Sequence, residues 1–300
     1  MPETSGQSKN WGSYKQLEVR YDPELRVLWY WMKPQGRPCF NLELLAELRR
    51  FQELIRPACE RRRGYGEPRV QYLVLGSAVP GVFNLGGDLD LFSSLIVRRD
   101  AAGLLRYATA CIDVLYPNAV NFHLPVTTVS LIQGDALGGG FEAAISSNVV
   151  IAERNAKFGL PEILFNLIPG MGAYSFLIRR TNLSTTRRLM TSGETLTAQD
   201  MFHLGLVDLV VDEGEGEMAV EELVRERGRR GNAHGAMNRI QNMVGPVTYE
   251  ELMSITRIWV ETALQLTDRD LRMIQSLVRA QNRRLQQVEE VGLRTMEGTG

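Results

Sequence analysis

The sequence predicts an α/β protein. Short apolar, β-branched runs suited to buried strands alternate with segments whose apolar residues recur every three to four positions, as in helices. Glycine-rich turns stand where strands pass into helices. With 300 residues, 44% of them hydrophobic, the chain can bury a full core, as one large domain or as a domain with an appendage.

The chain is expected to begin with a hairpin and a helix. Residues 17–22 and 26–32 have the composition of two strands, and an Asp–Pro pair begins the turn between them. Residues 41–55 carry apolar side chains at three-to-four spacing, which predicts an amphipathic helix. Asn41 is its expected N-cap.

Strands and helices then alternate through the centre of the chain. Buried strands are predicted at residues 69–78, 127–134, 148–153 and 206–212. Residues 100–116 should form a helix, ended by Pro117 because proline has no N–H to donate.

From about residue 218 to residue 287 the pattern is helical, with almost no strand signal. Two apolar stripes are typical of core packing: Leu252, Ile255, Trp259 and Leu266, then Leu271, Ile274, Leu277 and Val278. The expected organisation is a flexible tail over residues 1–15, an α/β core over residues 16–212, and a helical region over residues 213–300.

Composition and charge argue against several classes of protein. The formal net charge of −1 gives no overall case for a nucleic-acid or membrane-surface partner. The three cysteines and three histidines are scattered, so neither a disulfide framework nor a metal site is expected. The polar N-terminus lacks the apolar stretch of a signal peptide, and a cytoplasmic location is expected.

Two glycine-rich turns carry the strongest functional pattern. They are "GSAVPGVFNLGGDLDLF" at residues 76–92 and "QGDALGGGFEAAISS" at residues 133–147, and each follows a predicted strand and precedes a helix. The start of a helix has backbone N–H groups without internal partners, so such a turn can bind a phosphate. Two such turns can instead aim one N–H each at a single oxygen, forming an oxyanion hole for a thioester enolate.

Two glutamates follow glycine or proline at predicted helix starts. Glu142 comes just after the triple glycine, and Glu162 comes just after Pro161. One interpretation is structural, because acids in a first helical turn favour the helix dipole, and Asp88 has the same interpretation as an N-cap. The other is catalytic, because two carboxyls facing one cleft can act as general acid and general base.

Three blocks together resemble the crotonase, or enoyl-CoA hydratase, superfamily: "FNLGGDL" at 83–89, "GDALGGGFEAA" at 134–144 and "FGLPEILFNLIPGMGAYSFL" at 158–177. With "IWVETALQL" at 258–266, these blocks look more narrowly like the bacterial diffusible-signal-factor synthases. The broad superfamily often has Ser–Ala–Gly–Ala where this chain has residues 84–87, Asn–Leu–Gly–Gly. That departure agrees with the narrower family.

The resemblance implies a spiral of ββα units with a C-terminal helical trimerisation region. The positions that match the family's functional residues are Gly87 and Gly139 for the oxyanion-hole amides, Glu142 and Glu162 for the catalytic pair, and Met171, Trp259 and Leu277 for the acyl-chain pocket. The implied assembly is a homotrimer or a dimer of trimers.

The implied activity is a two-step conversion of a 3-hydroxyacyl chain on acyl carrier protein. The enzyme would dehydrate it to a cis-2-enoyl thioester and then hydrolyse the thioester, releasing a free unsaturated fatty acid that serves as a quorum-sensing signal. No resident cofactor is implied, since phosphopantetheine of the carrier, or CoA, holds the substrate.

Two alternatives stay open. One is an ordinary hydratase or related crotonase acting on acyl-CoA. The other is an additional role as a regulatory partner of the receiver domain of a sensor kinase, which the synthase family implies. Two basic clusters, Arg61–Arg63 and the four arginines of "RERGRRG" at residues 225–231, could dock an acidic carrier protein or be solvated surface charge.

Overall fold

The computed structural model describes residues 11–59 and 70–297, with side chains through residue 283. The strands are β1 (Leu17–Asp22), β2 (Val27–Met32), β3 (Tyr72–Ser77), β4 (Gly81–Asn84), β5 (Thr127–Ile132), β6 (Gly134–Leu137), β7 (Val149–Glu153), β8 (Lys157–Gly159), β9 (Thr195–Thr197) and β10 (Leu209–Val211). The α-helices are α1 (Leu42–Cys59), α2 (Leu89–Val97), α3 (Ala101–Ala119), α4 (Gly139–Ile145), α5 (Ala173–Arg180), α6 (Leu183–Ser192), α7 (Ala198–His203), α8 (Gly216–Gly228), α9 (Gly231–Val244), α10 (Tyr249–Ala263) and α11 (Asp268–Glu297). Two short 3-10 helices are η1 (Asn121–His123) and η2 (Pro161–Phe165).

The strands form two sheets. A six-stranded sheet has the order β1-β2-β3-β5-β7-β10, and a four-stranded sheet has the order β4-β6-β8-β9. All neighbours pair in parallel except β1 with β2 and β8 with β9. The predicted α/β class is therefore confirmed.

Successive strands alternate between the sheets, which makes the chain a spiral. β3, β5 and β7 are neighbours in the larger sheet, and each is followed at once by β4, β6 or β8, which are neighbours in the smaller one. Helices then carry the chain back to the next turn. This is the expected repetition of ββα units, and it places three turns side by side.

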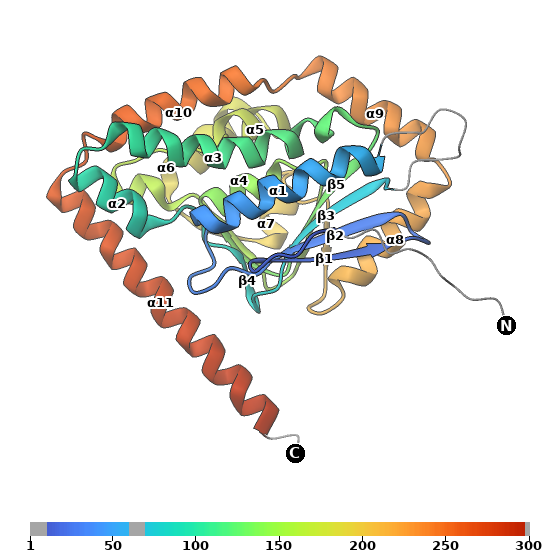
Figure 1. Cartoon of the computed structure of the whole chain (residues 1–300), viewed down its shortest axis with the longest axis horizontal. Coiled ribbons are helices and arrows are strands. Elements are labelled where there is room, and N and C mark those ends of the chain that lie inside the picture. The colour runs from blue at the N-terminus through green and yellow to red at the C-terminus, as the bar shows by residue number, and fades with distance from the viewer. Residues whose placement is uncertain (1–10, 60–69, 298–300) are drawn as a thin grey trace.

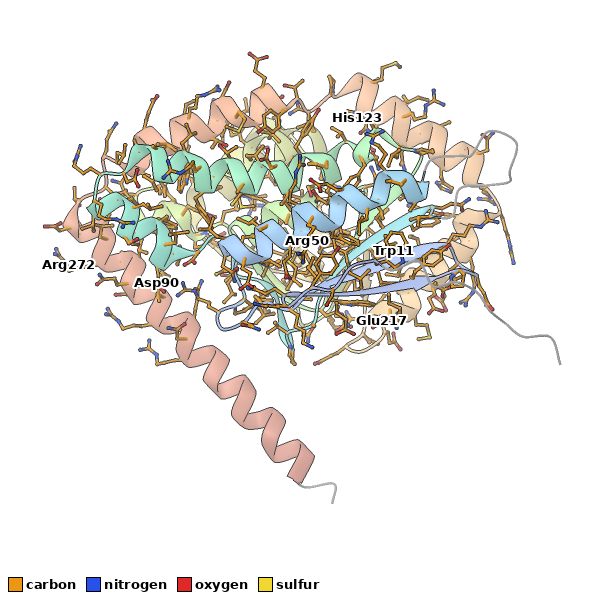
Figure 2. All side chains as sticks on the ribbon, viewed as in Figure 1. Trp11, Arg50, Asp90, His123, Glu217 and Arg272 are labelled. Atoms are coloured by element: carbon orange, nitrogen blue, oxygen red, sulfur yellow. The ribbon has the colours of Figure 1, made fainter. Side chains whose placement is uncertain are left out.

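Helices cover both faces of the larger sheet, as Figure 1 shows for α1 and α3 on one side and α8 on the other. The side chains of β2 are buried along the whole strand because Leu28 and Tyr30 face the main core, whereas Trp29 and Trp31 pack with the residues of α8. In Figure 2 the side chains fill the space between the strands and these helices. A strand covered on both sides is rich in apolar and β-branched residues, and this is why the sequence pattern identified the strands of this sheet.

Most N-terminal expectations are confirmed. β1 and β2 form the predicted antiparallel hairpin. Asn41 caps α1, since its Oδ1 accepts a hydrogen bond of 2.8 Å from the Leu44 backbone N–H. Asp88 likewise caps α2 by accepting from the Leu91 N–H at 3.1 Å, so its structural interpretation is correct.

The predicted end of the helix before Pro117 is wrong, because α3 continues through the proline to Ala119. Proline at this position leaves the carbonyl of Asp113, four residues earlier, without its helical donor. The Arg49 side chain of α1 supplies a replacement, donating from Nη1 to that carbonyl at 3.2 Å. A tertiary contact thus satisfies the group that proline leaves open.

The smaller sheet was not anticipated. The predicted strands correspond to β3, β5, β7 and β10, whereas the sequence pattern gave no sign of β4, β6, β8 or β9 as separate strands. These four contain only three or four residues each, and glycine occurs in three of them. Such segments are too short to show a hydrophobic period.

The elements after β10 are all helical within the described residues, as the sequence indicated. α10 packs along α3, while α11 contacts α2 and η2 before extending away from the body toward the C-terminus (Figure 1). No described helix has the length and apolar character needed to cross a bilayer. The first ten residues of the predicted tail, and Arg61–Arg63, lie outside the described residues.

Candidate active site

The site lies at one end of the smaller sheet. β4, β6 and β8 run in parallel, with Asn84 opposite Ala136 and Leu137 opposite Gly159. Because the carboxyl ends of parallel neighbours meet at one edge, the three segments that follow these strands lie side by side. Residues from about 85, 138 and 160 onward, distant in the sequence, therefore come together.

The first segment carries Gly87. The preceding Gly86 has a φ of +95°, a conformation that favours glycine, and a Cβ there would lie 3.0 Å from the backbone nitrogen of Gly139. Two backbone bonds of 2.8 Å hold the segment against the chain before α1, from the Leu85 N–H to the Pro38 carbonyl and from the Phe40 N–H to the Gly86 carbonyl.

Side chains strengthen the same attachment. The largely buried guanidinium of Arg37 forms ion pairs with Asp88 at 3.2 Å and with Asp90 at 2.9 Å. Asp90, labelled in Figure 2, lies in the first turn of α2. The loop that carries Gly87 is therefore fixed to residues 37–40 by backbone and charge together.

The second segment is the triple glycine. Gly138 has a φ of +52° and donates from its N–H to the Gly159 carbonyl at 2.8 Å, which joins the second segment to the third. A Cβ on Gly140 would lie 2.0 Å from the Asn84 carbonyl oxygen, so only glycine fits there. Gly139 begins α4, and its N–H therefore has no helical acceptor.

The Gly87 and Gly139 amides have the properties expected of an oxyanion hole. Both residues line the same cavity. Neither N–H donates a hydrogen bond within the part of the chain that the structure describes. Two unpaired donors at one cavity wall can bind a carbonyl oxygen and stabilise the negative charge that forms on it during reaction.

Glu142 lies in the first turn of α4 and is 1% exposed. Its Oε1 accepts two backbone hydrogen bonds, from the Met171 N–H at 2.7 Å and the Ala173 N–H at 2.8 Å. These bonds fix the carboxyl group and favour its ionised form. The loop before α5 thus orients the side chain that α4 supplies.

Glu162 lies in η2, directly after Pro161. Its Oε2 is buried and has no hydrogen-bond partner within the described residues. Its Oε1 lies close over Gly138, where a Cβ would come within 2.6 Å of that oxygen. An unpaired buried carboxyl oxygen beside two free amides is a group available to a ligand.

Burial sets the protonation of this pair. Desolvation raises the pKa of Glu142, and the two backbone donors partly oppose that rise. Desolvation also raises the pKa of Glu162, and the negative charge of Glu142 raises it further. Glu142 therefore loses its proton first, and over a range of pH the site holds one carboxylate and one carboxylic acid.

The cavity has a volume of about 300 Å³ and mostly apolar walls. All seven residues named by the resemblance line it: Gly87, Gly139, Glu142, Glu162, Met171, Trp259 and Leu277. Trp259 of α10 stacks edge-on against Phe92 of α2, with ring centroids 5.8 Å apart. The structure thus brings together every predicted site residue, while their roles stay predictions.

Other lining residues were missed by the sequence analysis. Among them are Phe92, Tyr107 and Cys111, which face the cavity from α2 and α3. No motif marks these positions, and a helical apolar stripe does not tell a cavity wall from a filled core. The arginines of residues 225–231 contribute nothing to the lining.

The family described as "Enoyl-CoA hydratase/isomerase" matches residues 62–238. "Probable enoyl-CoA hydratase 2, mitochondrial" of Arabidopsis thaliana is 28% identical over 201 residues, covering 66% of this chain and 61% of that protein. "Methylglutaconyl-CoA hydratase, mitochondrial" of Mus musculus is 30% identical over 164 residues, covering 53% of this chain and 50% of that protein. The chain thus matches half to three-fifths of the length of these curated relatives.

Solved structures share the fold. An enoyl-CoA hydratase from Bacillus halodurans has a TM-score of 0.71 at 20% identity, covering 87% of this chain and 99% of that one. Pseudomonas aeruginosa DspI has a TM-score of 0.67 at 22% identity, covering 82% of this chain and 93% of that one. The human mitochondrial delta3-delta2-enoyl-CoA isomerase has a TM-score of 0.67 at 19% identity, covering 95% of this chain and all of that one. At these identities the likeness concerns the fold alone.

Proposed function

Because the chain belongs to the enoyl-CoA hydratase/isomerase family, the crotonases, we propose that it acts between carbons 2 and 3 of an acyl thioester. More narrowly, we propose that it dehydrates a 3-hydroxyacyl chain on acyl carrier protein to the cis-2-enoyl thioester and then hydrolyses the thioester. The product is a free cis-2-unsaturated fatty acid of the diffusible-signal-factor class.

One observation carries this proposal. Glu142 and Glu162 line one cavity with different protonation tendencies, beside two unpaired backbone N–H groups. Dehydration needs a base at carbon 2, an acid at the 3-hydroxyl and stabilisation of the enolate between them. The site offers one group for each need.

In the first step, dehydration, each of these groups has one role. The Gly87 and Gly139 amides bind the thioester oxygen and acidify carbon 2. The Glu142 carboxylate removes the proton from carbon 2, and electrons move onto the oxygen to form the enolate. The enolate collapses to the carbon 2–carbon 3 double bond, and the 3-hydroxyl leaves as water with the proton of Glu162. Glu142 is now protonated and Glu162 ionised.

The second step uses this exchanged state. The Glu162 carboxylate takes a proton from water as the hydroxide attacks the thioester carbonyl, and the same two amides bind the tetrahedral oxyanion. The intermediate then expels the thiolate, which takes the proton of Glu142. Glu142 is again ionised and Glu162 protonated, so the two steps form one closed proton cycle.

The alternative is a hydratase that acts on acyl-CoA, and the names of the curated relatives favour it. Both reactions use the same glutamates and amides. A direct test offers 3-hydroxyacyl-carrier protein and crotonyl-CoA to the purified enzyme and identifies the free acids by mass spectrometry. We expect a free cis-2-enoic acid from the carrier-bound substrate. Hydration of crotonyl-CoA without release of any free acid would exclude the synthase and favour the hydratase.

We also propose a homotrimer, or a dimer of trimers, formed through the C-terminal helices. Exposed apolar side chains on α9 support this: Met237, Ile240, Met243 and Val244. Light scattering should give a trimer or hexamer that Met243→Asp dissociates.

Binding by a receiver domain of a sensor kinase rests on the resemblance alone, and a pull-down with that domain tests it.

A further inference from the structure

A buried tyrosine hydroxyl joins the loop of Gly87 to the segment before α1. Tyr107 of α3 is 4% exposed, and its Oη accepts a hydrogen bond of 2.7 Å from the Asp88 backbone N–H. The same hydroxyl donates to the Phe40 carbonyl at 2.8 Å. It therefore bridges two backbone segments that lie far apart in the sequence.

Phe40 holds the peptide group before the Gly87 Cα, and Tyr107 holds the peptide group after it. The peptide before it is trans, so the Gly86 carbonyl and the Gly87 N–H point in opposite directions. Since that carbonyl accepts from the Phe40 N–H at 2.8 Å, the Gly87 N–H points away from Phe40. The peptide after it is held through the Asp88 N–H by Tyr107.

The hydroxyl completes a closed circuit of three hydrogen bonds. Phe40 supplies both a donor and an acceptor from its backbone, and the oxygen of Tyr107 is the only side-chain group in the circuit. A Cβ on Gly87 would lie 3.2 Å from that oxygen, so the hydroxyl is in close contact with the glycine. Its proton is committed to Phe40, and it acts on a ligand through Gly87.

We infer that Tyr107 is a positioning residue of the oxyanion hole, whose hydroxyl holds the peptide after Gly87 and, through the Phe40 carbonyl, the segment whose N–H orients the peptide before it. The inference rests on the proposed function, in which the Gly87 N–H binds the thioester oxygen. It adds a residue that no motif in the sequence marks. Desolvation raises the pKa of Tyr107 well above its usual value, which keeps the donated proton on the oxygen.

The test measures carbonyl polarisation directly. The probe is a ketone analogue that lacks the 3-hydroxyl and has a methylene in place of the thioester sulfur, labelled with ¹³C at the carbonyl, so that it binds without being dehydrated or hydrolysed. In the wild-type protein we expect the bound carbonyl resonance to move downfield of its position in water. In the Tyr107→Phe variant, saturated with the same probe, we expect the carbonyl resonance to return most of the way toward its position in water.

Tyr116→Phe is the matched control. Tyr116 lies on the same helix, but its ring packs against His123 and Tyr249 and does not line the cavity. It should leave the carbonyl resonance unchanged. With carrier-bound substrate, Tyr107→Phe should lower kcat about tenfold, less than the 10²–10³ caused by losing an oxyanion donor outright, with KM within about twofold.

The possible outcomes distinguish the proposed oxyanion hole from the positioning role of Tyr107. An unshifted carbonyl in the wild-type protein would contradict the proposed oxyanion hole itself. A shift equal in wild type and Tyr107→Phe would overturn the role of Tyr107 and leave the proposed function standing. If the Phe variant does not fold, 3-fluorotyrosine at position 107 keeps the shape and hydroxyl while weakening the oxygen as an acceptor. An intermediate shift then supports the inference, and an unchanged shift overturns it.

Discussion

The six-stranded sheet and the four-stranded sheet lie next to each other on the same spiral, and they differ in strand length and in composition. β2, β3 and β5 have six residues each and are almost entirely buried. β4, β6 and β8 have three or four residues and include glycine. The site residues follow the short strands. The long strands build stability, and the short ones set the relative positions of reacting groups.

The largest expected effect on turnover comes from the carboxyls that follow the short strands. Glu142→Gln and Glu162→Gln should each lower kcat by about 10³ or more, since a positioned acid or base contributes about 10²–10⁴ and each group serves in both steps. Release of the unsaturated acid, measured by mass spectrometry, gives the turnover. Circular dichroism spectra should match the wild type, which would show that the fold is intact. Near-full turnover in either variant would contradict the two-carboxyl mechanism.

The next largest effect on kcat is expected at Gly86, in the loop that follows β4. Gly86→Ala places a Cβ 3.0 Å from the Gly139 nitrogen at a φ of +95°, so we expect kcat to fall by about 10²–10³ as one donor is blocked. Gly81→Ala is the control, because Gly81 has a φ of +68° but no atom near its added Cβ. Both variants carry backbone strain. Only Gly86→Ala should lose activity beyond what that strain causes. Equal losses in the two variants would argue against a catalytic role of the Gly139 amide.

A third prediction concerns pH. The first step needs Glu142 ionised and Glu162 protonated, and the pKa of both carboxyls is raised by burial. We expect a bell-shaped profile of kcat/KM near neutral pH, with limbs that change about tenfold per pH unit. A profile flat from about pH 5 to about pH 9 would contradict this assignment.

The same carboxyls predict a pH dependence of stability. The folded-state pKa values of Glu142 and Glu162 lie above the unfolded ones. The stability that their protonated forms contribute is therefore present below the unfolded pKa and is lost as pH rises through the folded pKa. The free energy of unfolding should fall by up to about 1.4 kcal/mol per pH unit for each proton released, and Glu162→Gln should reduce that slope. Urea unfolding at several pH values measures it.

The smallest effect on turnover is expected in the larger sheet. Leu28 of β2 is fully buried, and Leu28→Ala should lower the free energy of unfolding by about 2–5 kcal/mol. Turnover of the folded variant should stay within about twofold of the wild type, because Leu28 does not line the cavity. A large loss of activity in protein that remains folded would show that the two sheets are not separable in this way.

The same difference explains what could be predicted from the sequence. β3, β5 and β7 were found because burial on both faces gives them runs rich in apolar and β-branched residues. β4, β6 and β8 were not, since their pairing depends on register with neighbours far along the chain. Pro117 misled the prediction of α3 for a related reason, because the compensating donor is Arg49 from another helix. Local patterns cannot report partners that the fold supplies.

The site shows the same limit. Glu142 and Glu162 were candidates from position alone, and the resemblance named them as a pair, yet their shared cavity depends on Leu137 lying opposite Gly159. The hydrogen bonds from Met171 and Ala173 that hold Glu142 also come from a loop about thirty residues later. Tyr107 had no signal, because a tyrosine in an amphipathic helix looks like core.

The spiral has a consequence for the order in which a ribosome builds the protein. Each turn passes the reaction centre once and adds its own part: the Gly87 amide after β4, the Gly139 amide and Glu142 after β6, and Glu162 after β8. A nascent chain that ends before β8 has both amides and one carboxyl but no second carboxyl, and the Met171 and Ala173 donors that orient Glu142 come later still. Under the proposed function, the growing polypeptide therefore lacks the complete carboxyl pair until the third turn has closed.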